Sequence, residues 1–391
     1  MNSQPYRTPP KFWAPKLSKP IFKVFWYFRN RDLAKQKIVD VEIRNADKLA
    51  RSLDQDQGIL LTPNHSFHFD SYCLLQAADL LDVPFYFMTA WQVFGVSTPW
   101  QQWVMQKNGC FSVNREGIDT ESFKVANDIL QNRKEPLVIF PEGDIYHTND
   151  HVTPFREGAA AIAISAARRS KRPLSIIPVA IKAKYLEDPL PGVLPTLTKL
   201  EQRLLWNPST TMPVVDRIVR IASAALGLKE FEILGLVQGG ELPDRIKKFL
   251  LSILESYEGS LGIKNIGHLP SDRIAEIRRR AIAVTKNGPI SIEQERELQQ
   301  TLDRMFLATQ LYSYPGNYLV ANPTPERIAE TVDKLEEDLL GVTYPTVRGN
   351  RKVFVNFGDP VPVSSSKGNA PSPAELSDSL RLRVQSLLDE L

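Results

Sequence analysis

The chain has 391 residues, of which 42% are hydrophobic and 24% are charged, and its formal net charge is +3. This composition is typical of a soluble globular protein, and the length allows one large domain or two ordinary ones. The weak positive charge is unlike the dense basic surface of a nucleic-acid-binding protein, so we expect no nucleic-acid partner. The two cysteines, Cys73 and Cys110, do not imply a disulfide framework and suit a reducing compartment.

The N-terminal segment, residues 1–37, is predicted to be amphipathic. Its part from 11 to 35 mixes aromatic side chains with cations: Phe12, Trp13, Phe22, Phe25, Trp26, Tyr27 and Phe28 lie among Lys11, Lys16, Lys19, Lys23, Arg29 and Arg31. This mixture favours an interfacial helix on an anionic membrane surface, and the alternative is a helix packed on the main domain by its aromatic face. Since the sequence shows no secretory signal and no run of about 18–20 apolar residues, we expect a cytoplasmic protein that is soluble or peripheral to a membrane.

From about residue 38 to 182, strand-like and helix-like runs alternate. The strand-like runs are 58–62, 84–88, 109–113, 136–140 and 174–181, and the helix-like runs are 41–53, 70–82, 98–107, 119–132 and 157–169. This alternation predicts an α/β domain with a largely parallel sheet flanked by helices.

After residue 185 the pattern becomes mainly helical. Ser291 with Gln294 predicts a capping box, Thr324 before Pro325 predicts a helix start, and Gly341 predicts a helix end. The run 352–358 predicts one more strand, and residues 364–391 a C-terminal loop and helix. The candidate helices before that strand are 213–227, 243–257, 271–286, 291–312 and 325–340.

Two short stretches place polar groups just after apolar, strand-like runs. Asn64, His65 and Asp70 follow one run, and Glu142 and Gly143 follow another. Catalytic groups often lie on such loops. A histidine titrates near neutral pH, and a nearby carboxylate can orient it and stabilise its protonated form, so the pair can take a proton from a hydroxyl. The alternative is a surface histidine with Asp70 capping the next helix.

Four blocks, in this order, resemble the glycerolipid acyltransferase superfamily. They are N-H-x4-D at 64–70, a glycine and an arginine at Gly109 and Arg115, F-P-E-G at 140–143, and an apolar strand with a central proline at Pro178. The superfamily includes enzymes that acylate glycerol 3-phosphate and 1-acylglycerol 3-phosphate. The resemblance implies a fold like that of glycerol-3-phosphate acyltransferase over about residues 38–185.

The resemblance also implies roles for individual residues. His65 would be the general base and Asp70 would orient it. Arg115 would hold the phosphate of an acceptor, because a guanidinium offers several donors in a planar fork. Further substrate-binding residues are Asn64, Gly109, Glu142, Gly143 and Arg156.

The implied reaction moves a fatty acyl group from acyl-CoA or acyl carrier protein to a lipid hydroxyl in phospholipid biosynthesis. The lead acceptor is 1-acylglycerol 3-phosphate. The alternative acceptors are glycerol 3-phosphate and a non-phosphate lipid alcohol. Thioester hydrolysis and a non-catalytic membrane lipid-binding protein are two further hypotheses. We expect no cofactor beyond the acyl co-substrate. We also expect no metal, because the histidine pairs His65/His68 and His147/His151 lack a third ligand at a suitable spacing.

One departure from the family pattern concerns the acceptor. Family members that act on phosphorylated glycerols often continue F-P-E-G with a small hydroxyl residue and an arginine. Here Asp144 follows instead, and the next arginine is Arg156, within a segment close to the family's F-(K/R)-x-G pattern. A phosphate-bearing acceptor therefore does not follow from the motif alone, and Arg156 is a candidate to contact the acceptor.

The family also leads us to expect a short strand soon after the Pro178 strand. The matching run is 352–358, more than 150 residues later. We therefore expect it to lie in the same sheet as 136–140 and 174–181. The acyltransferase-like domain would then comprise 38–185 plus 351–363, and residues 186–350 would be a mainly helical insertion.

Overall fold

The computed structural model describes residues 11–115, 119–264, 269–287, 290–314, 316–364 and 371–391. The chain forms two compact units. The first comprises residues 1–114, 119–193 and 342–391, and the second comprises 115–118 and 194–341. Residues 1–10 of the N-terminal segment and most of the predicted loop at 364–373 lie outside the described residues.

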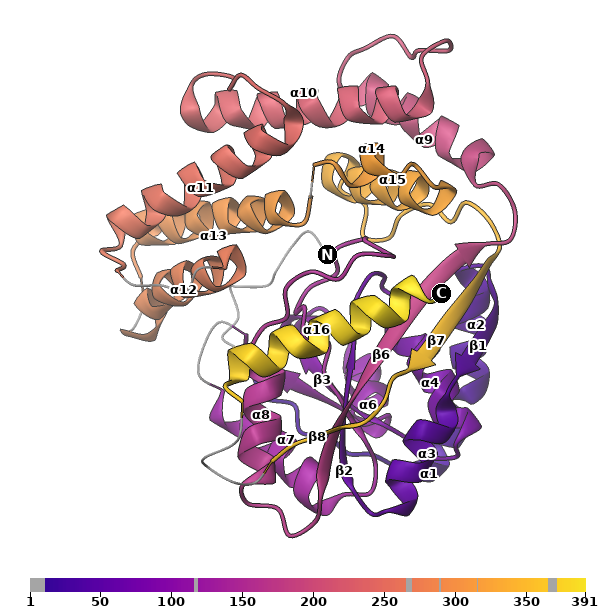
Figure 1. Cartoon of the computed structure of the whole chain (residues 1–391). Helices are drawn as coiled ribbons and strands as arrows, with labels where there is room; N and C mark the ends of the chain where they lie inside the picture. Colours follow the sequence, from indigo (N-terminus) through magenta and orange to yellow (C-terminus); the bar gives the residue numbers. More distant parts are fainter. Residues whose placement is uncertain (1–10, 116–118, 265–268, 288–289, 315, 365–370) are drawn as a thin grey trace. The chain divides into compact units, whose positions relative to one another are not determined.

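The first unit is built on a mixed β-sheet. Its strands are β1 Ile38–Arg44, β2 Gly58–Pro63, β3 Tyr86–Ala90, β4 Cys110–Val113, β5 Leu137–Val138, β6 Leu174–Tyr185, β7 Arg351–Phe357 and β8 Val361–Pro362. They lie in the order β1-β7-β6-β2-β5-β3-β4, with β8 paired to β6 (Figure 1). β6 is antiparallel to β7 and β8, whereas β1–β7, β2–β5, β2–β6, β3–β4 and β3–β5 are parallel. The predicted α/β class with a largely parallel sheet is confirmed.

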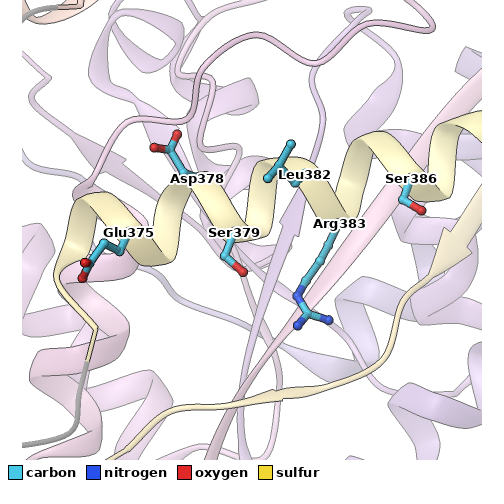
Figure 2. Close-up of a pocket in the computed structure, with 6 residues that line it drawn as sticks. All are labelled: Glu375, Asp378, Ser379, Leu382, Arg383 and Ser386. Carbon is cyan, nitrogen blue, oxygen red and sulfur yellow. The ribbon is translucent and has the colours of Figure 1, made fainter.

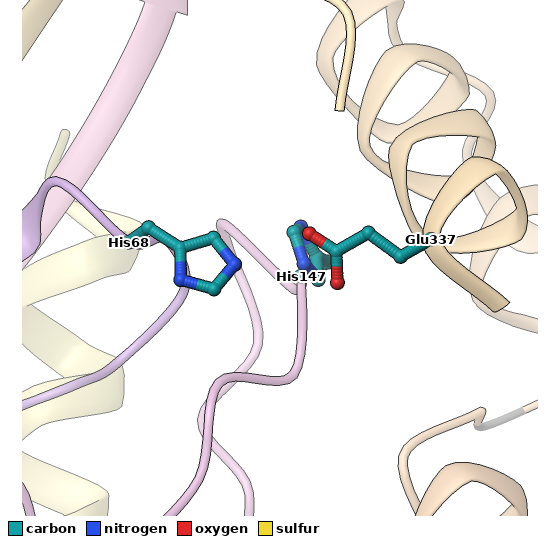
Figure 3. A group of neighbouring side chains, drawn as sticks. All are labelled: His68, His147 and Glu337. Carbon is teal, nitrogen blue, oxygen red and sulfur yellow. The ribbon is translucent and has the colours of Figure 1, made fainter. Parts of the chain in front are cut away.

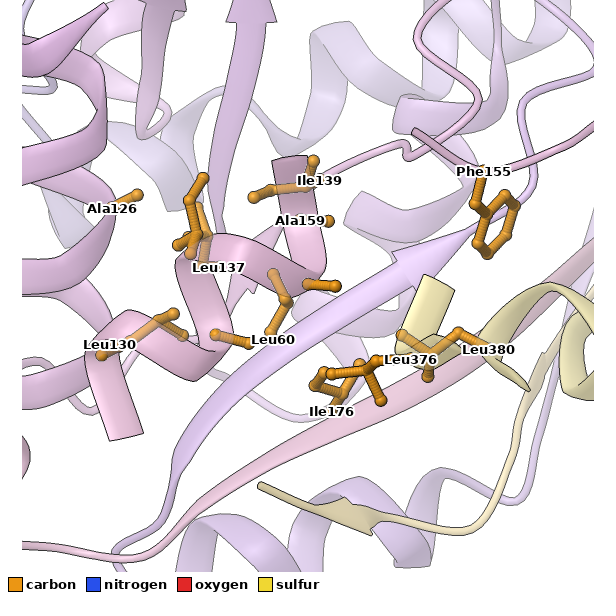
Figure 4. Packing of buried hydrophobic residues seen from close by; sticks show 14 of the residues in the cluster. Leu60, Ala126, Leu130, Leu137, Ile139, Phe155, Ala159, Ile176, Leu376 and Leu380 are labelled. Atoms are coloured by element: carbon orange, nitrogen blue, oxygen red, sulfur yellow. The ribbon is translucent and has the colours of Figure 1, made fainter. Parts of the chain in front are cut away.

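Helices cover both faces of this sheet, and each face has a hydrophobic core. Strand β2 shows how the sequence divides between them: Leu60 joins one core, and Ile59 and Leu61 join the other, because side chains alternate along a strand. Figure 4 shows Leu60 in the core with Leu130 and Leu376. The helices of this unit are α1 Lys19–Val24, α2 Trp26–Lys35, α3 Ala46–Asp54, α4 Asp70–Leu80, α5 Trp91–Gly95, α6 Pro99–Lys107, α7 Thr120–Asn132, α8 Gly158–Ala167 and α16 Pro373–Asp389.

The helix predicted at 41–53 is wrong in its first part. Residues 38–44 form β1, and α3 begins only at Ala46. Apolar and charged side chains alternate from Asp40 to Arg44, and this period of two fits a strand. The strand becomes stable through parallel pairing with β7, a partner far away in the sequence.

Strand β7 returns to the main sheet after the long helical stretch. Val355 lies opposite Ile181 of β6 and Ile43 of β1, so β7 fills the space between these two strands. Val353, Val355 and Phe357 are fully buried, which explains the alternation of large apolar residues in this run. The expectation that 352–358 belongs to the sheet of β5 and β6 is confirmed.

Two asparagine side chains complete the backbone hydrogen bonds of β6 beyond the end of β2. The last residue of β2, Pro63, lies opposite Val179. Further along, Asn64 accepts from Ile181 N at 2.7 Å and donates to Ile181 O at 2.9 Å. Asn149 makes the same two bonds with Ala183, at 2.8 and 2.6 Å. The side-chain amides thus satisfy buried backbone groups that have no strand partner on this side.

The second unit is helical. Its core is formed by helices α10 to α13 and includes Leu226, Phe249, Ile277 and Met305. The predicted capping box at Ser291 is present, as are the Thr324 cap and the left-handed Gly341, so these helix boundaries are confirmed. The helices are α10 Val214–Leu234, α11 Leu242–Ser260, α12 Pro270–Ala283, α13 Ile292–Tyr312, α14 Tyr318–Ala321 and α15 Pro325–Leu340, with a short 3₁₀ turn at Val284–Asn287; α9, Leu190–Arg203, begins in the first unit and continues in the second.

The N-terminal segment is helical only from Lys19 onward. Residues 11–18 form neither helix nor strand. Trp13 exchanges hydrogen bonds with Ser112 of β4: Trp13 N donates to Ser112 Oγ and Ser112 N donates to Trp13 O. The Trp13 ring also stacks on Phe94, with ring centroids 5.2 Å apart. This part of the segment is therefore packed on the first unit.

Gly58, at the start of β2, supports a prediction about stability. A Cβ at this position would lie 2.0 Å from the backbone O of Leu130, which cannot move without displacing the end of α7. Gly158, at the start of α8, has open space around it. We expect Gly58→Ala to cost about 3 kcal/mol or more or to prevent folding, and Gly158→Ala to change stability by less than about 1 kcal/mol. Urea denaturation of both variants measures this, and equal midpoints would contradict the close approach of β2 and α7.

Candidate functional site

His65 and Asp70 form a hydrogen-bonded pair at the carboxyl end of β2. His65 Nδ1 lies 3.0 Å from Asp70 Oδ2, the imidazole is 20% exposed, and the carboxylate is fully buried. The same oxygen accepts from Phe67 N at 2.9 Å, so the carboxylate fixes the loop between β2 and α4. Asp70 is the first residue of α4 and makes no side-chain capping bond there. Because a carboxylate accepts hydrogen bonds, this contact favours the tautomer of a neutral imidazole that has its proton on Nδ1 and its lone pair on Nε2.

The F-P-E-G turn after β5 holds His65 from a second side. The Phe140 ring stacks on the imidazole, with centroids 4.1 Å apart. Glu142 is buried, and its Oε1 accepts from His65 N at 2.6 Å. Its Oε2 accepts from Thr153 N at 3.0 Å and from the Thr153 hydroxyl. Glu142, in the loop after β5, therefore binds both the loop after β2, through His65, and a later part of its own loop, through Thr153.

Burial raises the pKa of Glu142 to about 7, because a charged carboxyl is poorly stabilised away from water. The three donors from Thr153 and His65 act in the opposite direction, since they stabilise the carboxylate. The carboxyl thus titrates near neutral pH while it serves as an acceptor for three N–H and O–H groups.

Gly143 and Arg156 lie together on the same turn. Gly143 has φ +83, and a Cβ there would be 2.6 Å from Arg156 Nε. Arg156 N donates to Pro141 O at 2.8 Å, and its Nη2 donates to Asp144 Oδ2 at 2.8 Å. The departure from the family pattern at position 144 therefore has a structural counterpart, because the unusual acid forms an ion pair with the next available arginine.

The remaining predicted site residues have different places. Asn64 uses its amide in the bonds to Ile181 described above and in one to Ser66 Oγ, so its contacts are structural. Gly109 lies just before β4, at the amino end of the parallel strands, whereas His65 lies at their carboxyl end. The φ of Gly109 is +88, and a Cβ would be 2.6 Å from Phe85 O, which explains the glycine. Arg115 is half-buried and clusters with the second unit, so its part in acceptor binding stays a prediction.

Comparison with protein families decides the class. Residues 40–182 match the family model Acyltransferase.

These residues form an acyltransferase domain of the glycerolipid acyltransferase family.

The match supports an acyltransferase enzyme, and membership of this domain in the family implies an acyl donor and a lipid acceptor as substrates. No curated protein matches the chain. The matched range contains His65, Asp70 and Glu142, as well as both arginines discussed above.

Two contacts of the candidate site were not predicted from the sequence. Thr153 holds Glu142, and Gln385 of α16 binds the loop on both sides of His151: its Oε1 accepts from Val152 N at 2.9 Å and its Nε2 donates to Asp150 O at 3.1 Å. Neither residue belongs to a short motif or to a periodic pattern. Only the folded chain brings them near the F-P-E-G turn.

Two further histidines lie close together in the acyltransferase domain. The rings of His68 and His147 are arranged edge to face with centroids 6.0 Å apart (Figure 3). Figure 3 also labels Glu337, a residue of α15 in the second unit. Because zinc sites in proteins use three or four protein ligands, these two histidines alone do not make one. The expectation of no metal stays a prediction.

A separate pocket lies on the C-terminal helix of the acyltransferase. Its lining residues all belong to one side of α16: Glu375, Asp378, Ser379, Leu382, Arg383 and Ser386 (Figure 2). None of them is a predicted site residue. A depression along a single helix lacks the convergent polar groups that are typical of an active site, so we assign it no part in catalysis.

The raised pKa of Glu142 predicts a pH effect on stability. Between pH 4.5 and about 7 the folded protein keeps this proton, whereas the unfolded chain has released it, so the stabilisation present at low pH is lost as the pH rises to 7. The interval from 4.5 to about 7 corresponds to at most about 3 kcal/mol. Glu142→Gln cannot titrate and serves as the reference. Urea denaturation from pH 5 to pH 8 should show the wild type losing stability relative to this variant as the pH rises, with the loss levelling off above pH 7. Parallel pH profiles would contradict the raised pKa.

Proposed function

We propose that the protein transfers a fatty acyl group from an acyl thioester, acyl-CoA or acyl carrier protein, to a hydroxyl of a glycerolipid-type acceptor in phospholipid biosynthesis. The observation that carries the proposal is the His65–Asp70 pair, 3.0 Å apart in a domain of the acyltransferase family. The lead acceptor is 1-acylglycerol 3-phosphate.

In this mechanism His65 is the general base. Nε2 takes the proton of the acceptor hydroxyl while the oxygen attacks the thioester carbonyl carbon. Asp70 holds Nδ1–H and stabilises the imidazolium that forms, which is the task of the carboxylate in a catalytic triad. The tetrahedral intermediate then collapses, the carbon–sulfur bond breaks, and the thiol leaves with the proton from Nε2. The acceptor itself is the nucleophile, so no serine or cysteine nucleophile is needed.

Glu142 and Phe140 are positioning residues in this proposal. Glu142 holds the backbone of His65 and Phe140 stacks on its ring, so both restrict the imidazole to one orientation. Such restriction matters because proton transfer requires heavy atoms within about 2.6–3.2 Å of each other. Arg115 and Arg156 are the candidates for binding the acceptor.

A panel of acceptors with one labelled acyl-CoA tests the substrate. The panel contains 1-acylglycerol 3-phosphate, glycerol 3-phosphate and a neutral lipid alcohol. Acyl transfer to any of them supports the proposal, and the preferred one identifies the acceptor. Free fatty acid without transfer would indicate a hydrolase, and neither product would indicate a non-catalytic lipid-binding protein.

We expect His65→Ala to lower the rate of acyl transfer by about 10²–10⁴-fold, because general bases typically contribute this much. The control is His151→Ala, which removes an exposed histidine and should leave the rate unchanged. Circular dichroism and urea denaturation establish that both variants are folded. Turnover near that of the wild type by folded His65→Ala protein would exclude the mechanism.

Membrane attachment is the second part of the proposal. Trp26, Tyr27 and Phe28 of α2 are 50%, 66% and 47% exposed, and Trp100 of α6 is 63% exposed. The rings of Phe25 and Trp100 lie 6.4 Å apart, so α2 and α6 contribute to one aromatic surface. Within the described residues, no helix has the length and apolar character needed to cross a bilayer. Exposed aromatic rings beside Lys23 and Arg31 suit the interface of an anionic membrane.

The contact with lipid is therefore proposed for α1, α2 and α6, and point substitutions are the suitable test. Deleting residues 1–35 would also remove the packed segment 11–18 and the buried side chains of Phe22 and Arg29. We expect Trp26→Ser with Tyr27→Ser to weaken binding to anionic vesicles at least about tenfold, because each large aromatic ring buries substantial apolar area.

The matched control is Leu228→Ser with Phe231→Ser. These residues of α10 are 62% and 63% exposed and belong to the second unit. The control should bind vesicles as the wild type does, and added salt should weaken binding of the wild type. Equal loss in both double variants would indicate nonspecific hydrophobic adsorption and contradict the assigned surface.

A further inference from the structure

The ion pair between Arg156 and Asp144 lies on the turn that positions His65. Its atoms Nη2 and Oδ2 are 2.8 Å apart, and the side chains are 26% and 20% exposed. The same turn contributes Phe140, which stacks on the imidazole, and Glu142, which binds His65 N. The turn that holds the candidate base His65 thus also carries a charged pair that is partly exposed to solvent.

The guanidinium is placed there by Gly143. A side chain at position 143 would put its Cβ 2.6 Å from Nε and 2.8 Å from Cζ of Arg156, so glycine makes room for the guanidinium across the turn. The backbone of Arg156 is held by Pro141 O. Arg156 Nε is buried and meets no acceptor within the part of the chain that the structure describes. Since a guanidinium has five N–H donors, the bond to Asp144 leaves donor capacity for a ligand.

The negative charge of Asp144 determines which ligands can bind to the remaining N–H donors of Arg156. A guanidinium binds phosphate well because both are charged and their geometries match. Here a carboxylate already neutralises the guanidinium and repels an approaching phosphate dianion. A phosphate must therefore displace Asp144 or bind beside it, whereas an uncharged hydroxyl-bearing head group meets neither penalty.

We infer that Asp144 is a specificity-determining residue of the acceptor site, which disfavours phosphate-bearing acceptors by holding Arg156 in an ion pair. The inference rests on the proposed function, in that the acceptor is a lipid hydroxyl bound beside His65. It adds that this chain binds phosphate-bearing acceptors less tightly, relative to acceptors without a phosphate, than an otherwise identical chain with a neutral residue at 144.

The test is Asp144→Asn, which removes the charge and keeps the shape and an oxygen for Arg156. Calorimetry measures the Kd of glycerol 3-phosphate, and steady-state kinetics measure KM for 1-acylglycerol 3-phosphate and for monoacylglycerol. We expect the phosphate-bearing compounds to bind about tenfold more tightly, with unchanged KM for monoacylglycerol and acyl-CoA. Asp144→Ser should give the same result and serves if the first variant does not fold.

Two further variants assign the effect to this pair. Adding Arg156→Met to Asp144→Asn should remove the gain, because the freed guanidinium is then absent. Asp128→Asn breaks the Asp128–Arg133 pair of the first unit, 3.4 Å apart, and should change none of the constants. An unchanged Kd in Asp144→Asn, or a gain that survives Arg156→Met, would overturn the inference. Tighter phosphate binding without acyl transfer to any acceptor would uphold it and refute the proposed function.

Discussion

The buried carboxyl of Glu142 connects the segments on which the candidate site depends. It accepts hydrogen bonds from His65 on one side and from Thr153 on the other, and burial raises its pKa to about 7. A parallel sheet brings its loops to one edge, but it does not fix their mutual positions, because loops are held by side chains and not by the backbone ladder. Glu142 supplies that connection, and the Asp70 carboxylate supplies the matching one within the loop after β2. The imidazole of His65 is thereby held by two acids, one through its backbone and one through its ring.

Beyond the end of β2, side chains take the place of a neighbouring strand along one side of β6. Asn64 and Asn149 replace a missing strand along β6, each with a donor and an acceptor from one side-chain amide. Both residues belong to loops that also carry site residues, so the same contacts that complete the sheet fix the loops. Stability of the sheet and geometry of the site therefore depend on shared side chains. Replacing such an asparagine would be expected to affect both together.

Much of the fold follows from local patterns, and the exceptions have physical causes. Strands β2 and β6 and most helices are visible as apolar runs or periodic patterns, and the caps at Ser291 and Thr324 are local by nature. Residues 41–44 of β1 were predicted as part of a helix although their period of two fits a strand, and the partner that stabilises this strand, β7, lies far away in the sequence. The pair of His65 and Asp70 could be predicted because its members are close in the sequence, whereas Thr153 and Gln385 act across folded loops. Arg156 was identified from a motif, but its ion pair with Asp144 depends on the path of the turn around Gly143.

The position of β7 also determines when the sheet can be completed during synthesis. In the described sheet β7 is the strand that pairs with β1, and it also separates β1 from β6. About 300 residues must follow β1 before its partner exists, which at ribosomal speeds of roughly 5–20 residues per second takes about 15–60 s. During this time the nascent chain carries an unpaired first strand. Once β6 has been synthesised, one side of β6 is exposed as well, and both strands are apolar in part. Such unpaired edges can associate with other chains. The order of the strands thus gives the growing chain an unpaired edge that the finished structure no longer displays.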